Sequence, residues 1–315
     1  MTQLSFVTLD VFTTKTYEGN PLAVVFLPHP KDGQLTQRQK QTIAREFNLS
    51  ETIFVHEKAG NGETRTIDIF TESIELPFAG HPTIGAASWF LCHHPAAAEG
   101  RSGVKSLSMK AGEVPISLQD EGNGVVMAHV AHNVHVHERQ YPLIEVVRLY
   151  PSLEGYLAPE SIALFSVVKG MNQLLVELPS LEALSAVATS SGGQEASASF
   201  LDPEWADGMV ATYFYVKGVE DEKLGRKVIR TRMILGTLED PATGSAASGL
   251  AAYLSLAEGK AGQFVYDIVQ GVEMGRRSEI GVEVVIEGVE RIESLVLKGS
   301  AVKVSEGKIL VPEDA

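Results

Sequence analysis

The chain has 315 residues, of which 44% are hydrophobic and 21% charged, and it carries a net charge of −14 from 40 acidic and 26 basic residues. This is the composition of an ordinary globular protein, and the length allows one large or two medium domains. The acidic balance argues against a nucleic-acid partner, which usually meets a basic surface. It argues equally against attachment to an anionic membrane surface.

Cysteine usage and apolar runs restrict the class of protein further. Cys92 is the only cysteine, so an intramolecular disulfide and a cysteine-rich zinc site are both excluded. The first residues lack the pattern of a signal peptide, and no apolar run approaches the ~18 residues of a membrane span. We therefore expect a soluble, cytoplasmic protein with no membrane partner.

Alternating and apolar patterns in the first part of the chain predict strands and two helices. Strands are expected over residues 6–12, 22–27, 52–55 and 64–70. A helix is expected up to residue 47, with Thr36 as its cap. Residues 84–91 are small and apolar on nearly every side, which predicts a helix that is buried all round.

The middle of the chain is rich in strands and loops, and the last part repeats the pattern of the first. A second nearly all-apolar helix of the chain is expected over residues 246–256. Strands are expected over residues 208–216, 228–234, 282–286, 294–297, 301–304 and 309–311.

Two short segments about half a chain apart are similar in sequence. TIGAAS at residues 83–88 aligns with TGSAAS at residues 243–248, and each copy follows an X-Pro step and opens an apolar helix. A repeat of this kind indicates two lobes of like fold, each with a sheet around a central helix. Chance similarity between two alanine-rich helix starts is the alternative. We place the lobes at residues 1–125, joined by the tail at about 300–315, and at residues 126–299.

The two helix starts are candidates for binding an anion. Proline is favoured in the first position of a helix, and Asp240 is a favoured N-cap. The N–H groups of Gly80, His81, Gly244 and Ser245 would then point outward and, with the helix dipole, could hold one carboxylated substrate. An ordinary capping role for Asp240 and a structural role for His81 are the alternatives.

Glu51 is a candidate proton carrier, because it lies at a helix-to-strand junction beside a strongly apolar strand. Partial burial there would raise its pKa and let it shuttle a proton. The alternative is a surface glutamate at a strand entrance. Asn20 lies in the turn Gly19-Asn20-Pro21 and is a candidate for substrate binding, with a turn role as the alternative.

Four histidines gather in the middle of the chain, at His129, His132, His135 and His137. In a strand the last two would share one face. Zinc is conceivable, but no carboxylate or cysteine pattern accompanies them, so we favour an exposed strand or linker face and predict no metal site. Motifs for dinucleotide binding, phosphate binding and a serine nucleophile elbow are absent.

Four motifs, in order over most of the chain, resemble the signatures of the phenazine-biosynthesis PhzF-like proteins. They are GNPLAVV at residues 19–25, NLSETIFV at 48–55, LPFAGHPTIG at 76–85 and EDPATGSA at 239–246. QGVEMGR at residues 270–276 is similar to a fifth motif. There the family usually continues with Pro-Ser, whereas this chain has Arg277-Ser278, a departure that concerns the shape of the loop and not the reaction.

The resemblance implies the α+β, diaminopimelate-epimerase-like fold of two pseudo-symmetric lobes, each with a curled sheet around a central helix, together with a homodimer and no cofactor. It also implies that the residue at Glu51 is the acid/base that moves a proton between carbons of a carboxylated substrate. The epimerases of this fold use two facing cysteines, and the matching positions here look like Ala79 and Pro241. A two-thiol epimerase is thereby excluded.

We therefore predict a cofactor-independent isomerase that acts on a small carboxylated metabolite, whose identity the sequence does not give. The alternatives are a racemase or epimerase with a carboxylate base, and a non-catalytic metabolite-binding or interaction protein on the same fold. The predicted catalytic residues are Glu51, Asp240 and His81, and the predicted substrate-binding residues are Asn20, Gly80, Gly244 and Ser245.

Overall fold

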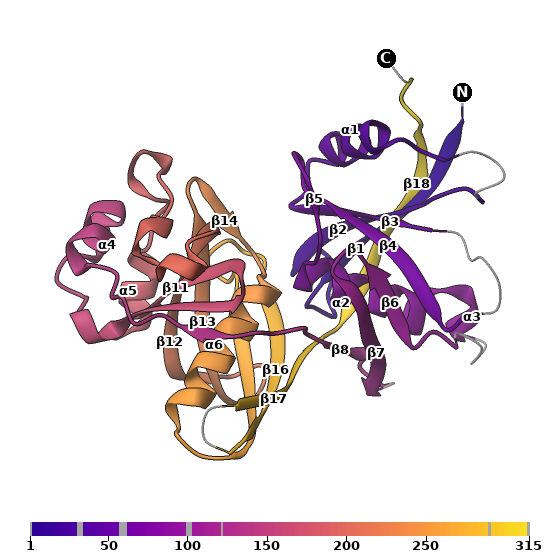
Figure 1. Ribbon diagram of the computed structural model, residues 1–315. Helices are drawn as coiled ribbons and strands as arrows, with labels where there is room; N and C mark the ends of the chain where they lie inside the picture. The colour runs from indigo at the N-terminus through magenta and orange to yellow at the C-terminus, as the bar shows by residue number, and fades with distance from the viewer. Residues whose placement is uncertain are drawn as a thin grey trace. The chain divides into compact units, whose positions relative to one another are not determined.

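The computed structural model describes residues 2–29, 34–56, 62–98, 103–120, 122–288 and 291–313 (Figure 1). The chain divides into two compact units, one made of Met1–His129 with Lys298–Ala315 and the other of Val130–Leu297. Among the described helices, none has both the length and the apolar character needed to cross a bilayer.

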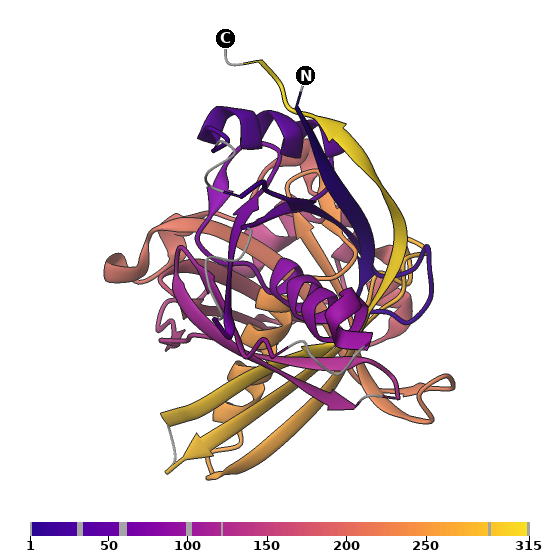
Figure 2. The same cartoon turned by 90° about the vertical axis from the view of Figure 1, so that its right-hand side faces the viewer.

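The sheet of the first unit contains strands from both ends of the chain. Its strands are β1 (Gln3–Val11), β2 (Asn20–Phe26), β3 (Glu51–Val55), β4 (Thr64–Phe70), β5 (Glu75–Leu76), β6 (Ser106–Met109), β7 (Gly112–Asp120), β8 (Val125–His129) and β18 (Ala301–Leu310). β1 pairs antiparallel with both β18 and β2. Figure 2 shows the first and last strands of the chain running side by side.

The remaining pairings of the first unit are partly parallel and partly antiparallel. β2 is parallel to β3, and β3 is antiparallel to β4. β4 is antiparallel to β5 and parallel to β6, and β6 is antiparallel to β7. β7 is in turn antiparallel to β8.

Helix α1 (Gln37–Phe47) covers one part of this sheet and begins as the sequence predicts. Thr36 is its N-cap, and its side chain accepts from the backbone N–H of Gln39 while the side chain of Gln39 accepts from the N–H of Thr36. This reciprocal capping box satisfies two first-turn donors. The buried face of α1 packs on an apolar cluster that includes Phe54 and Phe70.

Helix α2 (Gly80–Ser88) is the central helix of the first unit, and all nine of its residues are buried. It packs against β1, β2, β3, β6, β8 and β18. It begins four residues earlier than the predicted helix, and after Ser88 it continues as a π-helical turn (Trp89–His93), followed by α3 (Pro95–Ala98). The prediction of a helix buried all round is confirmed, with different ends.

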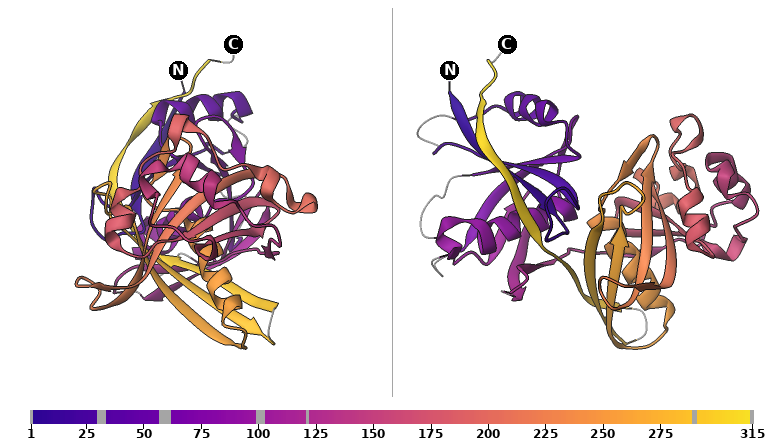
Figure 3. Two further views of the ribbon diagram at one scale, coloured as in Figure 1. Left: turned by 90° about the vertical axis from the view of Figure 1, so that its left-hand side faces the viewer. Right: turned by 180° about the vertical axis from the view of Figure 1, so that it is seen from behind.

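The second unit has its own set of strands. They are β9 (His135–Val136), β10 (Ile162–Val168), β11 (Gly170–Glu177), β12 (Gly208–Asp221), β13 (Arg226–Leu235), β14 (Leu238–Asp240), β15 (Gly262–Gln270), β16 (Ser278–Glu287) and β17 (Arg291–Gly299). Its central helix is α6 (Gly244–Ala257), which packs against β10, β11, β15 and β16 (Figure 3). Two shorter helices, α4 (Leu143–Leu149) and α5 (Leu181–Ala186), cover an apolar core around Leu174 and Phe214.

The pairing pattern of the second unit repeats that of the first. β10 is antiparallel to β11, β11 is parallel to β12, and β12 is antiparallel to β13. β13 is antiparallel to β14 and parallel to β15, and β15 is antiparallel to β16. In both units the central helix follows the short strand of this series. The fold is therefore α+β, with two lobes of the same topology.

The two central helices begin 164 residues apart, at Gly80 and Gly244, and not at the spacing of the aligned repeat. The aligned Thr83 lies one turn inside α2, whereas Thr243 is the N-cap of α6, so the predicted register of the repeat is wrong by one helical turn. The new register pairs Gly85 with Gly249. A Cβ on Gly85 would lie 2.2 Å from Leu22 Cδ2, and one on Gly249 would lie 2.6 Å from Gln173 Oε1. Each helix thus needs a glycine where it approaches the corresponding strand of its unit, β2 for α2 and β11 for α6.

Most predicted strands are confirmed, with ends that differ by a few residues. The largest differences are at β12, which extends to Asp221, and at the C-terminal end, where two predicted strands form the single strand β18. Residues typical of turns around Gly307 interrupt the alternation of apolar and polar residues, which predicted two strands. Backbone pairing with β1 nevertheless continues through these residues.

Candidate active site

Glu51 and His81 meet in the first unit. Glu51 opens β3 opposite Leu22 of β2, and His81 is the second residue of α2. His81 Nδ1 lies 3.0 Å from Glu51 Oε2. The histidine side chain is 3% exposed and the glutamate side chain 18% exposed. The residues that the sequence singles out separately therefore form one hydrogen-bonded acid/base pair.

The pKa of Glu51 is the result of opposing effects. Burial alone would raise it, as the sequence predicts, but the hydrogen bond and charge of His81, with a hydrogen bond from Ser50, outweigh burial. The pKa of Glu51 consequently lies below its ordinary value, and the predicted rise is wrong. The reason is the histidine partner, which lies 30 residues away in the chain and is visible only after folding.

His81 has one ring nitrogen left over. Its Nε2 is buried and has no hydrogen-bond partner within the described part of the chain. A buried polar atom without a partner is costly unless a ligand satisfies it. The first-turn amides of α2, at Gly80 and His81, also have no partner inside the helix, because the first four N–H groups of any α-helix have none. This end of α2 therefore combines several free hydrogen-bonding groups with a positive helix dipole.

Asn20 lies in the same part of the first unit. It is 1% exposed, and its Oδ1 lies 3.3 Å from Ser50 Oγ, next to Glu51. Gly19 before it has a φ of +69°, and a Cβ there would lie 2.3 Å from the carbonyl oxygen of Val11. The Gly-Asn-Pro motif is thus explained by a tight turn that delivers Asn20 to the strand start beside Glu51.

In the second unit the structure corrects the role predicted for Asp240 as a helix cap. Asp240 ends β14 and is 8% exposed, whereas α6 begins at Gly244 with Thr243 as its N-cap. Thr243 Oγ1 donates to Asp240 Oδ2 at 2.5 Å. Three residues separate Asp240 from the helix, and its carboxylate accepts from the hydroxyl of the capping threonine. Ser245 is half-buried in the first turn of α6, beside buried Gly244.

Gln270 is a residue of this region that sequence reasoning did not select. It is fully buried at the end of β15, and its Nε2 donates to the carbonyl oxygen of Asp240 at 2.7 Å. The available signal was its place in the fifth motif, directly before Gly271. That glycine has a φ of +74°, and a Cβ on it would lie 2.6 Å from the carbonyl oxygen of Pro241.

The histidine cluster is resolved into a smaller group. His135, His137 and Asp202 place possible ligand atoms within 4.8 Å of one another, and His129 and His132 lie outside this group. His137 is 7% exposed, so the prediction of an exposed face is wrong for it, because its ring is enclosed next to β10.

The nitrogen and oxygen atoms that this group could offer to a metal ion already take part in hydrogen bonds. His135 Nε2 lies 2.7 Å from Asp202 Oδ2, and the backbone N–H of Asp202 donates to His137 Nδ1 at 3.0 Å. His137 Nε2 is therefore the protonated nitrogen, and it lies 2.9 Å from Ser166 Oγ. A metal ion would have to displace these bonds. The geometry supports a network that ties β9 to the segment around Asp202.

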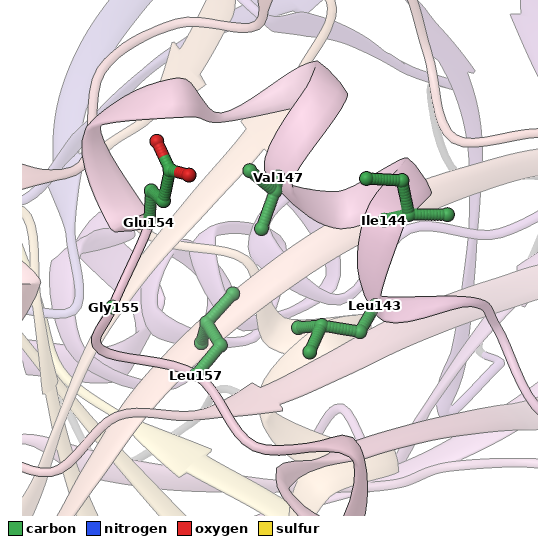
Figure 4. A pocket seen from close by; sticks show the side chains of 6 residues that line it. All are labelled: Leu143, Ile144, Val147, Glu154, Gly155 and Leu157. Atoms are coloured by element: carbon green, nitrogen blue, oxygen red, sulfur yellow. The ribbon is translucent and has the colours of Figure 1, made fainter.

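A cavity of about 420 Å³ lies elsewhere in the second unit, between α4 and the segment that follows it (Figure 4). Its walls are mainly aliphatic, and it contains none of the predicted site residues. Because it contains none of the residues that the motifs and the Glu51–His81 bond single out, we do not assign it to the reaction. The lining residues are Leu143, Ile144, Val147, Glu154, Gly155 and Leu157.

The predicted site residues thus form two groups, each described within its own unit. Asn20, Glu51 and His81 are joined through Ser50 and the Glu51–His81 bond, with Gly80 adjacent in α2. Asp240, Gly244 and Ser245 surround the turn into α6.

Comparison with known proteins agrees with this architecture. The profile of the PhzC-PhzF family, described as phenazine biosynthesis-like protein, matches residues 9–307. An uncharacterized isomerase, mll1393, of Mesorhizobium japonicum is 31% identical over 315 residues, which cover 98% of this chain and 99% of that protein. The trans-2,3-dihydro-3-hydroxyanthranilate isomerase of Pseudomonas aeruginosa is 31% identical over 310 residues, covering 96% and 98% of the two chains.

A solved structure shares the fold at lower sequence identity. The phenazine biosynthesis protein of the PhzF family from Bacillus anthracis superposes with a TM-score of 0.73 at 20% identity, covering 99% of this chain and 100% of the other. Together with the repeated strand pairing, this confirms the predicted fold class.

Proposed function

This chain belongs to the PhzF family of phenazine biosynthesis-like proteins and is an isomerase, and on this premise we propose that it moves a proton between two carbons of a small carboxylated metabolite, with Glu51 as the acid/base. The observation that carries the proposal is the hydrogen bond of 3.0 Å between Glu51 and His81 at the start of a buried helix. A carboxylate oriented by a histidine is a common arrangement for general acid/base catalysis.

The state of Glu51 suits the first step of such a reaction. Because its pKa lies below the ordinary value, the carboxylate is ionised at neutral pH and ready to accept a proton. Oε2 is bonded to His81, and we propose that the carboxylate uses its other oxygen to take the proton from carbon and return it to a second carbon. The same atoms serve both transfers, so the reaction needs no redox partner, and we propose that it needs no cofactor.

The substrate carboxylate is proposed to bind at a helix start. The amides of Gly80 and His81 lie in the first turn of α2, where unpaired N–H groups and the helix dipole favour an anion. The unpartnered Nε2 of His81 supplies a further group that a ligand can satisfy. In the second unit we propose that Asp240, Ser245 and the amide of Gly244 contact substrate, on the strength of their motif and their place at the start of α6.

Proton exchange in D2O tests the role of Glu51. Trans-2,3-dihydro-3-hydroxyanthranilate is the first compound to test, because two relatives are named as isomerases of this compound. The wild-type protein should introduce deuterium at one carbon and move a double bond, as followed by NMR. Glu51→Gln should lower the rate by about 10²- to 10⁴-fold, the range of general acid/base catalysis. Glu63→Gln is the matched control, since Glu63 belongs to a surface ion pair of the same unit.

The outcomes of this experiment separate the candidate functions. Exchange that persists unchanged in Glu51→Gln would refute the role of Glu51. Deuterium at one stereocentre, with inversion and no double-bond movement, would identify a racemase or epimerase. A rise in melting temperature with carboxylated ligands, without exchange of any of them, would identify a binding protein.

A histidine variant distinguishes the two ends of the acid/base pair. His81→Asn keeps a side-chain N–H near Glu51 but removes Nε2. If Glu51 carries the proton, this variant should retain more activity than Glu51→Gln, because the carboxylate remains. Equal loss in both variants would transfer the carrier role to His81 Nε2, with Glu51 orienting the ring, as a carboxylate orients the imidazole in hydrolytic triads.

A further inference from the structure

A series of hydrogen bonds fixes which ring nitrogen of the buried His137 carries a proton. Asn172 Nδ2 donates to the carbonyl oxygens of Asp207 and Met209 at 2.7 and 3.1 Å. Because a carbonyl oxygen can only accept, the orientation of the Asn172 amide is fixed, and its Oδ1 faces Ser166 Oγ at 2.6 Å. The Ser166 hydroxyl therefore donates its single proton to Asn172, and its oxygen accepts from His137 Nε2 at 2.9 Å.

The other ring nitrogen of His137 is an acceptor. The backbone N–H of Asp202 donates to Nδ1 at 3.0 Å, so a proton on Nδ1 cannot be accommodated while this bond is present. The nearest carboxylate oxygen, Asp202 Oδ2, lies 3.7 Å from Nδ1, which is beyond hydrogen-bonding distance. That oxygen already accepts from His135 Nε2 at 2.7 Å and from the N–H of Glu138 at 3.1 Å. The folded network thus requires a neutral His137.

We propose that His137 is a pH-sensitive switch, whose protonation breaks the bond from the Asp202 N–H and releases the segment of residues 197–205 from β9. The pKa of His137 lies below its ordinary value of 6.5, because burial and the charge of His135 outweigh the charge of Asp202. In an open state water solvates the ring, and His137 takes up its proton at an ordinary pKa. Acid therefore favours the open state. None of the proposed catalytic residues takes part in this switch.

The segment of residues 197–205 contributes to the apolar core of the second unit. Leu201 has no solvent exposure, and Phe200 packs against the same apolar cluster. The ring of Phe200 also meets the ring of Tyr141 edge to face, with centroids 4.8 Å apart. Trp205 stacks on His135 at a centroid distance of 4.6 Å. Release of the segment would break these contacts and expose apolar surface.

The groups around His137 leave its own protonation as the step that opens the network. Strands β10 and β11 face the ring with the neutral side chains of Ser166 and Asn172. His135 already donates to Asp202, so a proton on its second nitrogen breaks no bond of the network. Burial raises the pKa of Asp202, but the bonds from His135 and from two backbone N–H groups outweigh it and hold this pKa below 3.8. The titratable groups around His137 are His135, Glu138, Arg139 and Asp202.

Hydrogen exchange of the Asp202 amide measures the opening directly, because this N–H is the group that leaves His137. The open state binds a proton below pH 6.5, whereas the closed state does so only at its lower pKa. The closed state is therefore fully favoured above pH 6.5 and loses stability as the pH falls below it. The protection factor, which corrects for the intrinsic pH dependence of exchange, should fall about 10-fold from pH 7.5 to pH 5.5. EDTA in all samples keeps metal ions from competing for the histidines.

Two histidine variants identify the group that titrates. His137→Asn keeps an acceptor for the Asp202 N–H but has no proton to gain, so its protection factor should not depend on pH in this range. His132→Asn is the matched control. The ring nitrogens of His132 lie 3.0 Å from the carbonyl oxygen of Val130 and 3.2 Å from that of Ile292, so its protonation displaces no N–H group. This variant should retain the fall seen in the wild type.

Three results would overturn the proposal. The first is a wild-type protection factor that is the same at both pH values, and the second is an equal fall in His137→Asn. If His137→Asn does not fold, imidazole ¹⁵N NMR of the wild-type protein provides the third. His137 should carry its proton on Nε2 at pH 7.5, and a ring that carries it on Nδ1 would contradict the network from which the switch is inferred.

Discussion

Replacing His81 with leucine should reverse the sign of the contribution that Glu51 makes to the pH dependence of stability. In the wild-type protein the pKa of Glu51 lies below its ordinary value of 4.5. Its contribution to stability is therefore complete above about that pH and is lost as the pH falls through the lower, folded-state pKa. In His81→Leu the two largest opposing effects disappear, and burial, the strongest single effect on Glu51, raises the pKa above 4.5.

The variant should consequently gain stability as the pH falls through the raised pKa toward 4.5, where the wild type does not. At pH 7 the variant loses a hydrogen bond to a charged group, which contributes about 1.5–3 kcal/mol. It also leaves a carboxylate in a partly buried site, and removal of one partner of a fully buried pair costs about 3–5 kcal/mol. Because the Glu51 side chain is 18% exposed, we expect a loss at the low end, about 3 kcal/mol.

Urea unfolding at pH 7 and pH 4.5 measures this difference. The protein has two tryptophans, Trp89 in the first unit and Trp205 in the second. A Trp205→Phe background makes the fluorescence report on the first unit, which matters because two units need not unfold together. The double variant His81→Leu with Glu51→Gln should regain stability at pH 7 relative to His81→Leu alone and should lose the acid-side gain.

His56→Leu provides the control for this experiment. His56 lies 2.8 Å from Asp68, but Lys40 lies 2.8 Å from the same carboxylate oxygen, so Asp68 keeps a cationic partner. No reversal is expected there. An equal loss of stability at both pH values in His81→Leu, or a greater loss at pH 4.5, would refute the reasoning about Glu51.

Three further predictions concern stability. Gly85→Ala should cost about 1–3 kcal/mol of unfolding free energy, because the new Cβ would lie 2.2 Å from Leu22 Cδ2, and a melting temperature equal to wild type would contradict it. Thr36→Ala should cost about 1 kcal/mol through loss of the capping box, with Thr36→Ser restoring most of it in the same thermal melts. Arg277→Met should break the bidentate bond to Asp221, whose pKa is held below its ordinary value of 3.8. The wild-type protein should therefore lose stability as the pH falls below 3.8. The variant should lose less stability over the same range, as measured by acid denaturation.

The Arg277 network also gives a physical account of the departure from the family pattern at that position. Its guanidinium bonds both oxygens of Asp221 at 2.9 Å and also Glu279. These bonds join the loop after β15 to the end of the β12–β13 hairpin. An ion pair thus holds this loop in place.

Local sequence patterns by themselves determined three helices, α1, α2 and α6, and nine strands, β1 to β4, β12, β13 and β16 to β18. Thr36 followed by Gln39 specifies the start of α1, and the small apolar residues of α2 and α6 specify two helices that must be buried. These features depend on residues near one another in the chain, whose backbone and side-chain preferences act before any tertiary contact forms. The motifs likewise identified Glu51, His81 and Asp240 as candidates.

Tertiary structure decided how those candidates interact. The 30-residue separation of Glu51 and His81 hides a hydrogen bond that reverses the direction of the pKa shift expected from burial. Asp240 reads as a helix cap in sequence, yet the side chain of Gln270, 30 residues further on, holds it in a turn before the helix. The register of the internal repeat was fixed by where each helix meets its neighbouring strand. In each case the deciding contact joins residues distant in sequence, and only the folded chain brings such residues within hydrogen-bonding or van der Waals distance.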